Sequence, residues 1–416
     1  MFLKLNIRHW LIILILLLFG INMSYFCSKK KESNVAKDVK IIATLGKNGW
    51  LKVNDFCKNG ADILRINGSH IKSSDDLIET LSSVNRSLKI SNCDNIDVMY
   101  DTQGPEIRTR IVNNSKSESK NLAYKIKEND VIVVHTDLKS NAIIFNRYTT
   151  KQKNGVRTIN IGVNYENFVN DVNVDSEITI ENREVYAKVI SVDKQNGIVE
   201  LRITKINNEN NEYLLTDRRH INLLGAPVSQ DTLTENDKQY IKISALLGVK
   251  YYAISFARDA NDIKEARNLI SSAFMEDNPS ITETQLDEKM KQIKIIAKIE
   301  TRQGLDNIEQ IVKEADGAMV ARGDLSSEIP VEEVPYAKET IIETCNKYNK
   351  FSILATNVLE SLLSKKSASM NDIDVIATAL KLGVSSLMLS NETAASDAGV
   401  DAIKEMKKHI KYFINK

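Results

Sequence analysis

Short apolar runs alternate with stretches of helical periodicity along most of the chain. In residues 294–324, apolar runs at 294–300 and 317–320 bracket a segment whose leucine, isoleucine and valine residues recur at helical spacing. The first run ends with Lys298 and Glu300, and the second is followed by Arg322, Gly323 and Asp324. Parallel strands that are buried on both faces read as continuous apolar runs, so this stretch predicts a strand, a helix and a second, parallel strand.

The same alternation recurs on both sides of a central region of different character. The apolar runs that predict strands start near residues 39, 61, 96, 251, 294, 317, 351 and 385. Eight strand–helix repeats predict an α/β fold, a TIM (β/α)8 barrel, with an open doubly wound sheet as the competing arrangement. The chain lacks a Gly-x-Gly-x-x-Gly after the first run and any Gly-x-x-x-x-Gly-Lys, so dinucleotide-binding and P-loop interpretations have no motif to rest on.

The central region, residues 110–219, predicts an all-β domain inserted into the barrel. Its short runs are rich in valine and isoleucine and are separated by Asn, Asp, Lys and Gly. We therefore divide the chain into a leader at 1–37, the first part of the barrel at 38–109, the inserted domain at 110–219 and the second part of the barrel at 220–416. Within the barrel, the polar stretch 277–292 predicts a loop with one helical turn.

The composition of the N-terminal segment indicates that it interacts with a membrane. Lys4 and Arg8 precede residues 10–23, which are uncharged and almost wholly apolar. That run is short for a spanning helix, which needs about 20 residues, and it suits the apolar core of a signal peptide. Cys27 and a lysine-rich tether follow. Three fates of this segment are therefore possible: a cleaved signal peptide, an uncleaved anchor or a lipidated tether. Each of them predicts a membrane-associated or secretory-pathway location, and the cytoplasmic face of the membrane is not excluded.

Composition narrows the class of partner. Hydrophobic residues make up 42% and charged residues 27% of the chain, which is ordinary for a globular protein. The net charge of +1 gives no reason to expect a nucleic-acid partner. The four cysteines, at positions 27, 57, 93 and 345, are far apart in the sequence, so we expect buried free thiols and no disulfide framework.

Polar side chains follow five of the predicted barrel strands. The carboxyl ends of barrel strands meet at one mouth, so these side chains should converge. They are Arg65 and Asn67, Asp101 and Thr102, Lys298 and Glu300, Asp324, and Thr356.

This set suits a cation and an anionic substrate held together. Glu300 and Asp324 supply the hard oxygen ligands that Mg²⁺ or Mn²⁺ prefers. Lys298 and Arg65 carry charges that hold a phosphoryl group, and Gly323 lets backbone N–H groups approach an anion. A weakly hydrated cation would find an all-oxygen pocket, whose members are Asn67, Ser69, Asp101 and Thr102.

Each residue also has a structural interpretation. Lys298 could form an ion pair with Glu300 inside the barrel, and Arg65 could form one with Asp101. The remaining candidates would then be ordinary residues: a buried hydroxyl at Thr356, a hydrogen-bonded structural histidine at His70 and a solvated charge at Arg108. The number of such residues at successive strand ends favours a site over these alternatives.

Seven motifs resemble the pyruvate kinase family, in the family's order and approximate spacing. They are KIIATLG, ADILRINGSH, DTQGPEIRTR, AKIET, MVARGDLSSEIP, ATNVLES and LSNETA. The resemblance runs from about residue 39 to about residue 416 and includes the place of the inserted domain, which in this family is a lid that closes over the site. It implies transfer of a phosphoryl group from phosphoenolpyruvate to ADP, giving pyruvate and ATP, with Mg²⁺ (or Mn²⁺) and K⁺ as cofactors.

The resemblance also implies a role for each motif residue. Lys298 would neutralise the transferring phosphoryl group and the enolate, with Arg65 and Thr356 as further catalytic positions. The other roles are Mg²⁺ at Glu300 and Asp324; K⁺ at Asn67, Ser69, Asp101 and Thr102; nucleotide and phosphate contacts at Arg65, His70 and Arg108; and substrate contacts at Lys298, Gly323, Asp324 and Thr356.

Some positions depart from the family's pattern, and they keep other hypotheses open. Lys47-Asn48 stands where Pro-Ser or Pro-Ala is usual, Gln103 replaces a lysine, the turn at 181–183 replaces Asp-Asp-Gly, and Asn391 replaces a glycine. The segment near 367–371, a subunit contact in the family, lacks the family's arginine, although we still expect an oligomer through the barrel. We also expect no C-terminal regulatory domain. The alternatives to an active pyruvate kinase are a catalytically impaired binding protein tethered to a membrane, and a related barrel enzyme acting on phosphoenolpyruvate or a 2-oxo acid.

Overall fold

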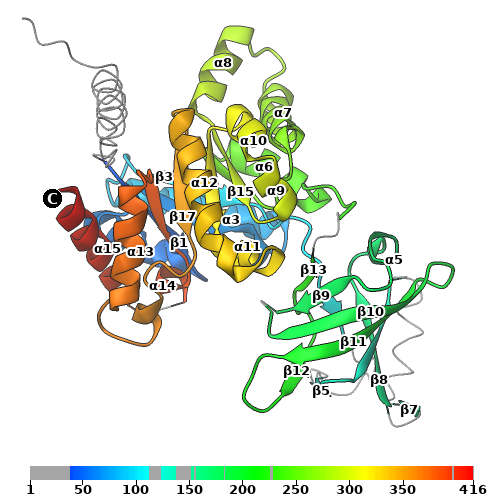
Figure 1. Cartoon of the computed structure of the whole chain (residues 1–416). Coiled ribbons are helices and arrows are strands. Elements are labelled where there is room, and N and C mark those ends of the chain that lie inside the picture. The colour runs from blue at the N-terminus through cyan, green and yellow to red at the C-terminus, as the bar shows by residue number, and fades with distance from the viewer. Residues whose placement is uncertain are drawn as a thin grey trace, which may run out of the picture.

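Eight parallel strands close into a barrel, which confirms the TIM barrel and excludes the open sheet. A computed structural model describes residues 38–111, 123–136, 151–153, 156–181, 183–224, 228–395 and 398–415. The strand order around the barrel is β1-β18-β17-β16-β15-β14-β3-β2 (Figure 1). The strands are β1 (Lys40–Leu45), β2 (Ile63–Asn67), β3 (Asp97–Asp101), β14 (Tyr251–Ile254), β15 (Lys294–Ile299), β16 (Gly317–Ala321), β17 (Phe351–Ala355) and β18 (Ser386–Leu389).

Helices cover the outside of the barrel and share one large apolar core with the outward faces of the strands. They are α2 (Val53–Asn59), α3 (Ser74–Ile90), α6 (Glu235–Leu246), α7 (Ala260–Asp277), α8 (Glu283–Gln292), α9 (Arg302–Asp306), α10 (Ile308–Glu314), α11 (Arg322–Glu328), α12 (Val334–Lys347), α13 (Met370–Lys381), α14 (Asn391–Ala394) and α15 (Gly399–Ile414). The segment predicted as a loop at 277–292 instead contains α8. The reason is a capping box between Thr282 and Gln285, together with Leu286 and Met290, which pack against the core.

The barrel interior is layered, and the layering places the polar side chains. Side chains of a strand alternate between its two faces, so residues two apart point the same way. An apolar cluster fills the barrel interior and consists of Ile42, Ile63, Met99, Ala253, Ile296, Met319, Ile353, Ala355 and Met388. Two residues further along five of these strands stand Thr44, Arg65, Asp101, Ser255 and Lys298, which form a buried polar layer at the mouth.

The central region forms a separate β domain with its own apolar core, as predicted (Figure 1). Its main sheet has the order β13-β9-β10-β11-β6-β8-β4, with β7 paired to β8, and β12 pairs with β5. Among the described residues its elements are β4 (Thr109–Arg110), β5 (Tyr124–Lys127), β6 (Val131–His135), β7 (Lys151–Lys153), β8 (Val156–Val163), α5 (Phe168–Asp171), β9 (Glu177–Ile180), β10 (Val185–Asp193), β11 (Ile198–Ile206), β12 (Glu212–Leu215) and β13 (Ile221–Leu224). The boundaries at 109/110 and 219/220 stay predictions.

The cysteine prediction is wrong for one pair. Cys57 and Cys93 form a disulfide, with their Cα atoms 6.4 Å apart. Cys57 lies in α2 and Cys93 follows α3, so packing of these two neighbouring helices brings together cysteines that are 36 residues apart in sequence. Cys345 is free and buried, as predicted, and Cys27 lies outside the described residues.

The predicted membrane location also needs correction. Of the helices that the described ranges contain, each is too short or too polar to cross a bilayer. The location rested on the apolar run at 10–23, and residues 1–37 lie outside the described residues. We therefore withdraw the membrane assignment.

Removing the disulfide should destabilise the barrel. In the chain-entropy account, a cross-link that closes a loop of this length stabilises the folded state by about 4 kcal/mol, and measured values are commonly about 2–4 kcal/mol. We expect the double variant Cys57→Ala/Cys93→Ala to lose stability in that range in urea denaturation followed by circular dichroism. A reductant should destabilise the parent chain but not the double variant. Equal stability of parent and double variant would contradict the prediction.

Candidate active site

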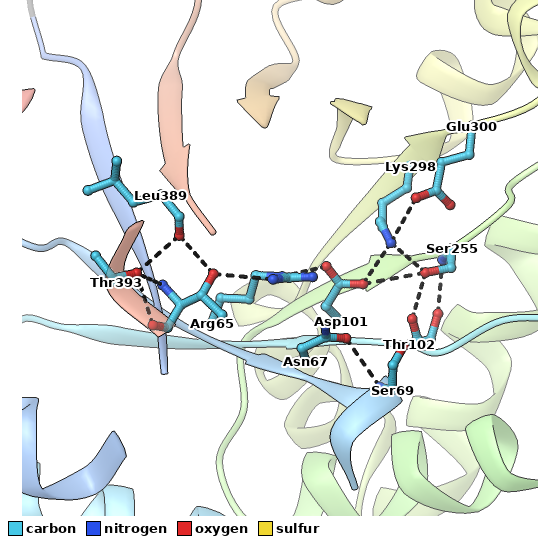
Figure 2. A network of polar contacts seen from close by, with 11 residues as sticks. Arg65, Asn67, Ser69, Asp101, Thr102, Ser255, Lys298, Glu300, Leu389 and Thr393 are labelled. Carbon is cyan, nitrogen blue, oxygen red and sulfur yellow. Dashed lines mark hydrogen bonds and ion pairs between the residues drawn. The ribbon is translucent and has the colours of Figure 1, made fainter. Parts of the chain in front are cut away.

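Lys298 lies at the centre of a buried network at the carboxyl end of the barrel (Figure 2). Its Nζ is 3.0 Å from Asp101 Oδ1 and 2.9 Å from Glu300 Oε1. It also donates a hydrogen bond of 2.6 Å to Ser255 Oγ. The lysine therefore sits between two carboxylates and a hydroxyl, contributed by β3, β15 and the end of β14.

Asp101 joins Lys298 to a second cation. Its other oxygen, Oδ2, accepts a hydrogen bond of 2.6 Å from Arg65 Nε, while Arg65 also donates to Thr44 Oγ1 at 3.2 Å. Asp101 and Glu300 are fully buried, and Lys298 and Arg65 are nearly so. Charges at such depth are costly unless they are paired, and here two cations and two anions compensate each other.

The protonation states follow from this arrangement. Burial opposes ionisation of Asp101, but Arg65 and Lys298 outweigh it and hold the pKa of Asp101 below its usual range. Burial likewise opposes the charge on Lys298, yet Asp101 and Glu300 raise its pKa. Glu300 responds differently: burial raises its pKa, Lys298 offsets part of the rise, and the nearby charge of Asp324 adds to it. Lys298 therefore stays a cation, whereas burial and the charge of Asp324 disfavour the ionised form of Glu300.

A divalent cation next to Glu300 would favour its ionised form. Glu300 Oε2 accepts a hydrogen bond of 2.7 Å from Phe256 N, but Oε1 has no hydrogen bond despite its ion pair with Lys298. Asp324, in the first turn of α11, is close enough to act on Glu300 electrostatically. Among the described residues no group of three or more His, Cys, Asp or Glu side chains forms a metal cage. Two carboxylates completed by water and substrate are, however, the usual protein share of a Mg²⁺ site, so this pair fits.

Three of the predicted K⁺ positions, Asn67, Ser69 and Thr102, lie around the fourth, Asp101 (Figure 2). Asn67 Oδ1 accepts a hydrogen bond of 3.2 Å from Ser69 N, and the Thr102 carbonyl accepts one of 2.6 Å from Ser255 Oγ. Both oxygens of Asp101 are already paired with cations, so neutral oxygens are the main donors left for a monovalent ion. Such a set fits a weakly hydrated cation, because it asks for oxygen donors and little dehydration energy.

Thr356 and Gly323 are held next to each other. Thr356 has φ of 66°, a left-handed conformation that is strained for a β-branched residue. The Arg322 guanidinium donates to the carbonyl oxygens of Ala355 and Thr356 and so ties the start of α11 to the end of β17. A Cβ at position 323 would lie 3.2 Å from Thr356 Cγ2, so glycine allows this close approach.

The two other nucleotide-site candidates lie outside the network. His70 is exposed and lines a cavity of about 650 Å³, together with Trp50 and the unusual residues Asn48 and Asn391. Arg108 is held at the base of the inserted domain instead: its guanidinium pairs with Glu106 at 2.7 Å and donates to the Arg218 carbonyl at 2.8 Å. The structure thus unites the candidates on β2, β3 and β15 but turns Arg108 to other partners.

Sequence reasoning missed Ser255 and Asp237. Ser255 ends the apolar run of the fourth barrel strand, and the same two-residue offset that places Lys298 could have found it. Asp237 caps α6 with Thr234 and accepts hydrogen bonds from the backbone N–H groups of Gln103 and Gly104, at 2.9 and 3.1 Å. It therefore fixes the loop that follows Asp101. The capping box was readable in the sequence, whereas its contact with this loop was not.

The fold and the mouth define the class: a (β/α)8 barrel that carries an inserted β domain and a buried lysine–carboxylate centre at the carboxyl ends of its strands. The family model described as "Pyruvate kinase, barrel domain" matches residues 36–403. The chain therefore belongs to the pyruvate kinase family, and the predicted resemblance is confirmed.

Curated relatives agree with this assignment. A pyruvate kinase from Borreliella burgdorferi is 30% identical over 374 residues, which is 89% of this chain and 67% of the relative. A pyruvate kinase from Geobacillus stearothermophilus is 30% identical over 372 residues, 89% of this chain and 56% of the relative. The chain thus spans between 56% and 67% of these two relatives. A crystal structure of a pyruvate kinase from Cryptosporidium parvum shares the fold, with a TM-score of 0.74, 24% identity and coverage of 92% of this chain and 71% of that one.

Ser255 should stabilise the network measurably. Ser255→Ala removes one of the three partners of Lys298 Nζ and takes away the hydrogen bond that the buried Thr102 carbonyl accepts, at a cost of about 1–3 kcal/mol. Urea denaturation should show that loss in the free energy of unfolding. Ser272→Ala is the matched control, because Ser272 Oγ donates to a backbone carbonyl on α7, away from the mouth, and surface changes of this kind stay within about 0.5 kcal/mol. Equal effects of the two substitutions would contradict the role of Ser255.

Proposed function

We propose that this protein is a phosphotransferase that moves the phosphoryl group of phosphoenolpyruvate to ADP, giving pyruvate and ATP. The observation that carries the proposal is the position of Lys298, a buried cation fixed by Asp101, Ser255 and Glu300 at the barrel mouth. Its charge is held in place before substrate arrives. Phosphoryl transfer depends mainly on positioning and on charge stabilisation, which such a preorganised cation supplies.

The neighbouring residues have distinct parts in this proposal. A terminal phosphate oxygen of ADP attacks phosphorus, and the bond to the enol oxygen breaks. Lys298 and Arg65 stabilise the negative charge on the transferring group and on the enolate that is left. Gly323 and Thr356 bind the substrate carboxylate, and the enolate carbon then takes a proton from a water molecule on the side where Thr356 lies. Because Asp101 neutralises part of the charge on Arg65 and Lys298, the pair attracts the anion without trapping it.

Glu300 and Asp324 would hold Mg²⁺ or Mn²⁺, which neutralises substrate oxygens when it is bound. The oxygen donors Asn67, Ser69, Asp101 and Thr102 would hold K⁺ beside the lysine. ADP would lie toward the cavity that His70 lines, where Lys47 and Asn48 replace the family's usual residues. Arg108 would first have to leave Glu106 to reach a phosphate.

One feature favours a second candidate, a catalytically impaired protein that still binds phosphoenolpyruvate. The turn that replaces the lid's usual Asp-Asp-Gly is engaged elsewhere: Glu181 lies 3.5 Å from Arg219, and Arg183 donates to the Ile329 carbonyl at 2.6 Å. A lid that completes the site by closing over substrate would need this turn to be free. Such a change would lower turnover more than it lowers metal binding.

Lys298→Met should reduce pyruvate formation, coupled to lactate dehydrogenase, at least about 100-fold with Mg²⁺ and K⁺ present, because a preorganised transition-state charge is lost. Lys298→Arg, which keeps the charge but not the geometry, guards against loss of folding and should also be slow. Lys250→Met is the control, since Lys250 forms an exposed ion pair with Asp97. An inactive parent chain that binds phosphoenolpyruvate would support the impaired protein, and one that does not bind it would overturn both candidates.

Loss of one carboxylate should weaken the metal site. We expect Asp324→Asn to lower Mn²⁺ affinity at least about tenfold, the equivalent of one lost charge-assisted contact, as measured by electron paramagnetic resonance of free Mn²⁺. Asp374→Asn, an exposed position on α13, should leave affinity unchanged. If both variants bind Mn²⁺ like the parent chain, Asp324 is not a ligand.

A further inference from the structure

A second cavity lies where the inserted domain meets the barrel, next to the charged network but separate from it. Its volume is about 440 Å³, which is within the range of small-molecule sites. β13 lines one side through Ile221, Asn222 and Leu223, and α11 contributes Glu328. Its lining residues include none of the catalytic or metal positions proposed above. This cavity is therefore a pocket in its own right.

The walls of the cavity suit a flat, apolar group. Ile107, Leu223 and Val228 line it with branched aliphatic side chains, and Phe256 adds an aromatic ring. His220 stands edge-on to that ring, with the two centroids 6.4 Å apart. Aromatic rings bury much apolar area and pack well in such edge-to-face surroundings, so an aromatic ligand body fits best.

One end of the cavity offers hydrogen-bond acceptors. Asn222 is 3% exposed, and its Oδ1 has no hydrogen-bond partner within the described part of the chain. Its Nδ2 donates to Glu328 Oε1 at 3.2 Å, so the amide nitrogen is engaged and Oδ1 is the atom left to accept a hydrogen bond. A buried acceptor without a partner costs about 1–3 kcal/mol, and a ligand that donates a hydrogen bond would recover that cost.

The charge at this end favours a cation. Burial raises the pKa of Glu328 to about 7, Asn222 lowers it in part, and the charge of Asp324 raises it again. A positive ligand group would relieve this excess of negative charge. The two arginines that line the cavity are already engaged: Arg258 donates to two backbone carbonyls and to Thr232, and Arg302 pairs with Glu333 at 2.5 Å.

We propose that this cavity is a binding site for a small aromatic amine, distinct from the site for the two anionic substrates. The aromatic body lies between Phe256 and Leu223, and the ammonium group donates to Asn222 Oδ1 and to the Glu328 carboxylate. The cavity does not suit the anionic substrates proposed above, because both arginines that line it are already paired with other groups. The inference rests on the cavity and its polar groups, and it does not depend on catalytic activity.

The site is placed to couple to the reaction centre. The Asn222–Glu328 bond joins the inserted domain to α11, and Arg183 adds a second contact to Ile329 just beyond that helix. Glu328 stands four residues after Asp324 on the same helix. An amine that bridges Asn222 and Glu328 would therefore hold the inserted domain in this orientation, next to the proposed metal ligand.

Titration calorimetry of the full chain with tryptamine tests the proposal. We expect saturable binding of one tryptamine per chain, with an affinity in the millimolar range or tighter. Indole-3-propionate, which has the same ring but a carboxylate, should not bind. Absence of saturable tryptamine binding, or equal binding of the two compounds, would overturn the proposal.

Three variants localise the binding. Glu328→Gln should weaken tryptamine binding at least about tenfold, because a charge-assisted hydrogen bond becomes a neutral one. Val228→Phe, which fills the cavity and leaves Asn222 and Glu328 unchanged, should abolish binding. Glu283→Gln on α8 is an exposed control and should bind like the parent chain. Thermal melting shows that each variant is folded, and unchanged affinity in both folded cavity variants would place the amine elsewhere.

Discussion

The mouth of the barrel depends on one interaction, the two-sided pairing of Asp101. A fully buried carboxylate survives as an anion here only because Arg65 holds one oxygen and Lys298 holds the other. Without Asp101, Arg65 would lose its ion pair and Lys298 would keep only Glu300, and a buried charge that loses its partner is costly because it has also lost its hydration. The three side chains therefore constrain one another, and Glu300 and Ser255 join through Lys298.

Barrel geometry is what allows these charges to meet. The interior side chains of neighbouring strands lie in layers, and the apolar cluster below the network excludes water from the barrel axis. Lys298 follows Ile296 by two residues, just as Asp101 follows Met99, so both point inward at the same level. The strained residue Thr356 lies one residue past β17, where its carbonyl oxygen accepts a hydrogen bond from the Arg322 guanidinium. Strain of this kind persists only where surrounding contacts hold it, and it is common at functional sites.

The inserted domain adds a second constraint through its contacts with α11. Arg183 and Asn222 are its polar links to α11, the helix that also carries Asp324. A ligand between Asn222 and Glu328 would add to these contacts and favour this orientation of the inserted domain. The reaction centre and the neighbouring cavity thus share a helix although they share no lining residue.

Much of the barrel was readable from the sequence because buried parallel strands leave a local signal. The run at 351–355 coincides with β17, and the polar residue after each run marked the mouth. The local pattern could not show which charges pair. Arg65 and Asp101 are 36 positions apart, and Lys298 is nearly 200 positions further on, so only closure of the barrel decided that they meet.

Other features were invisible for the same reason. Cys57 and Cys93 become neighbours only after α2 and α3 pack, and Arg108 reaches the Arg218 carbonyl, 110 positions away, only because the inserted domain folds back on the barrel. Whether a segment forms a turn or a strand depends on residues within a few positions, so the sequence by itself determined these local elements. Pairing, burial and protonation depend on groups that the chain brings from afar, and these only the tertiary structure decided.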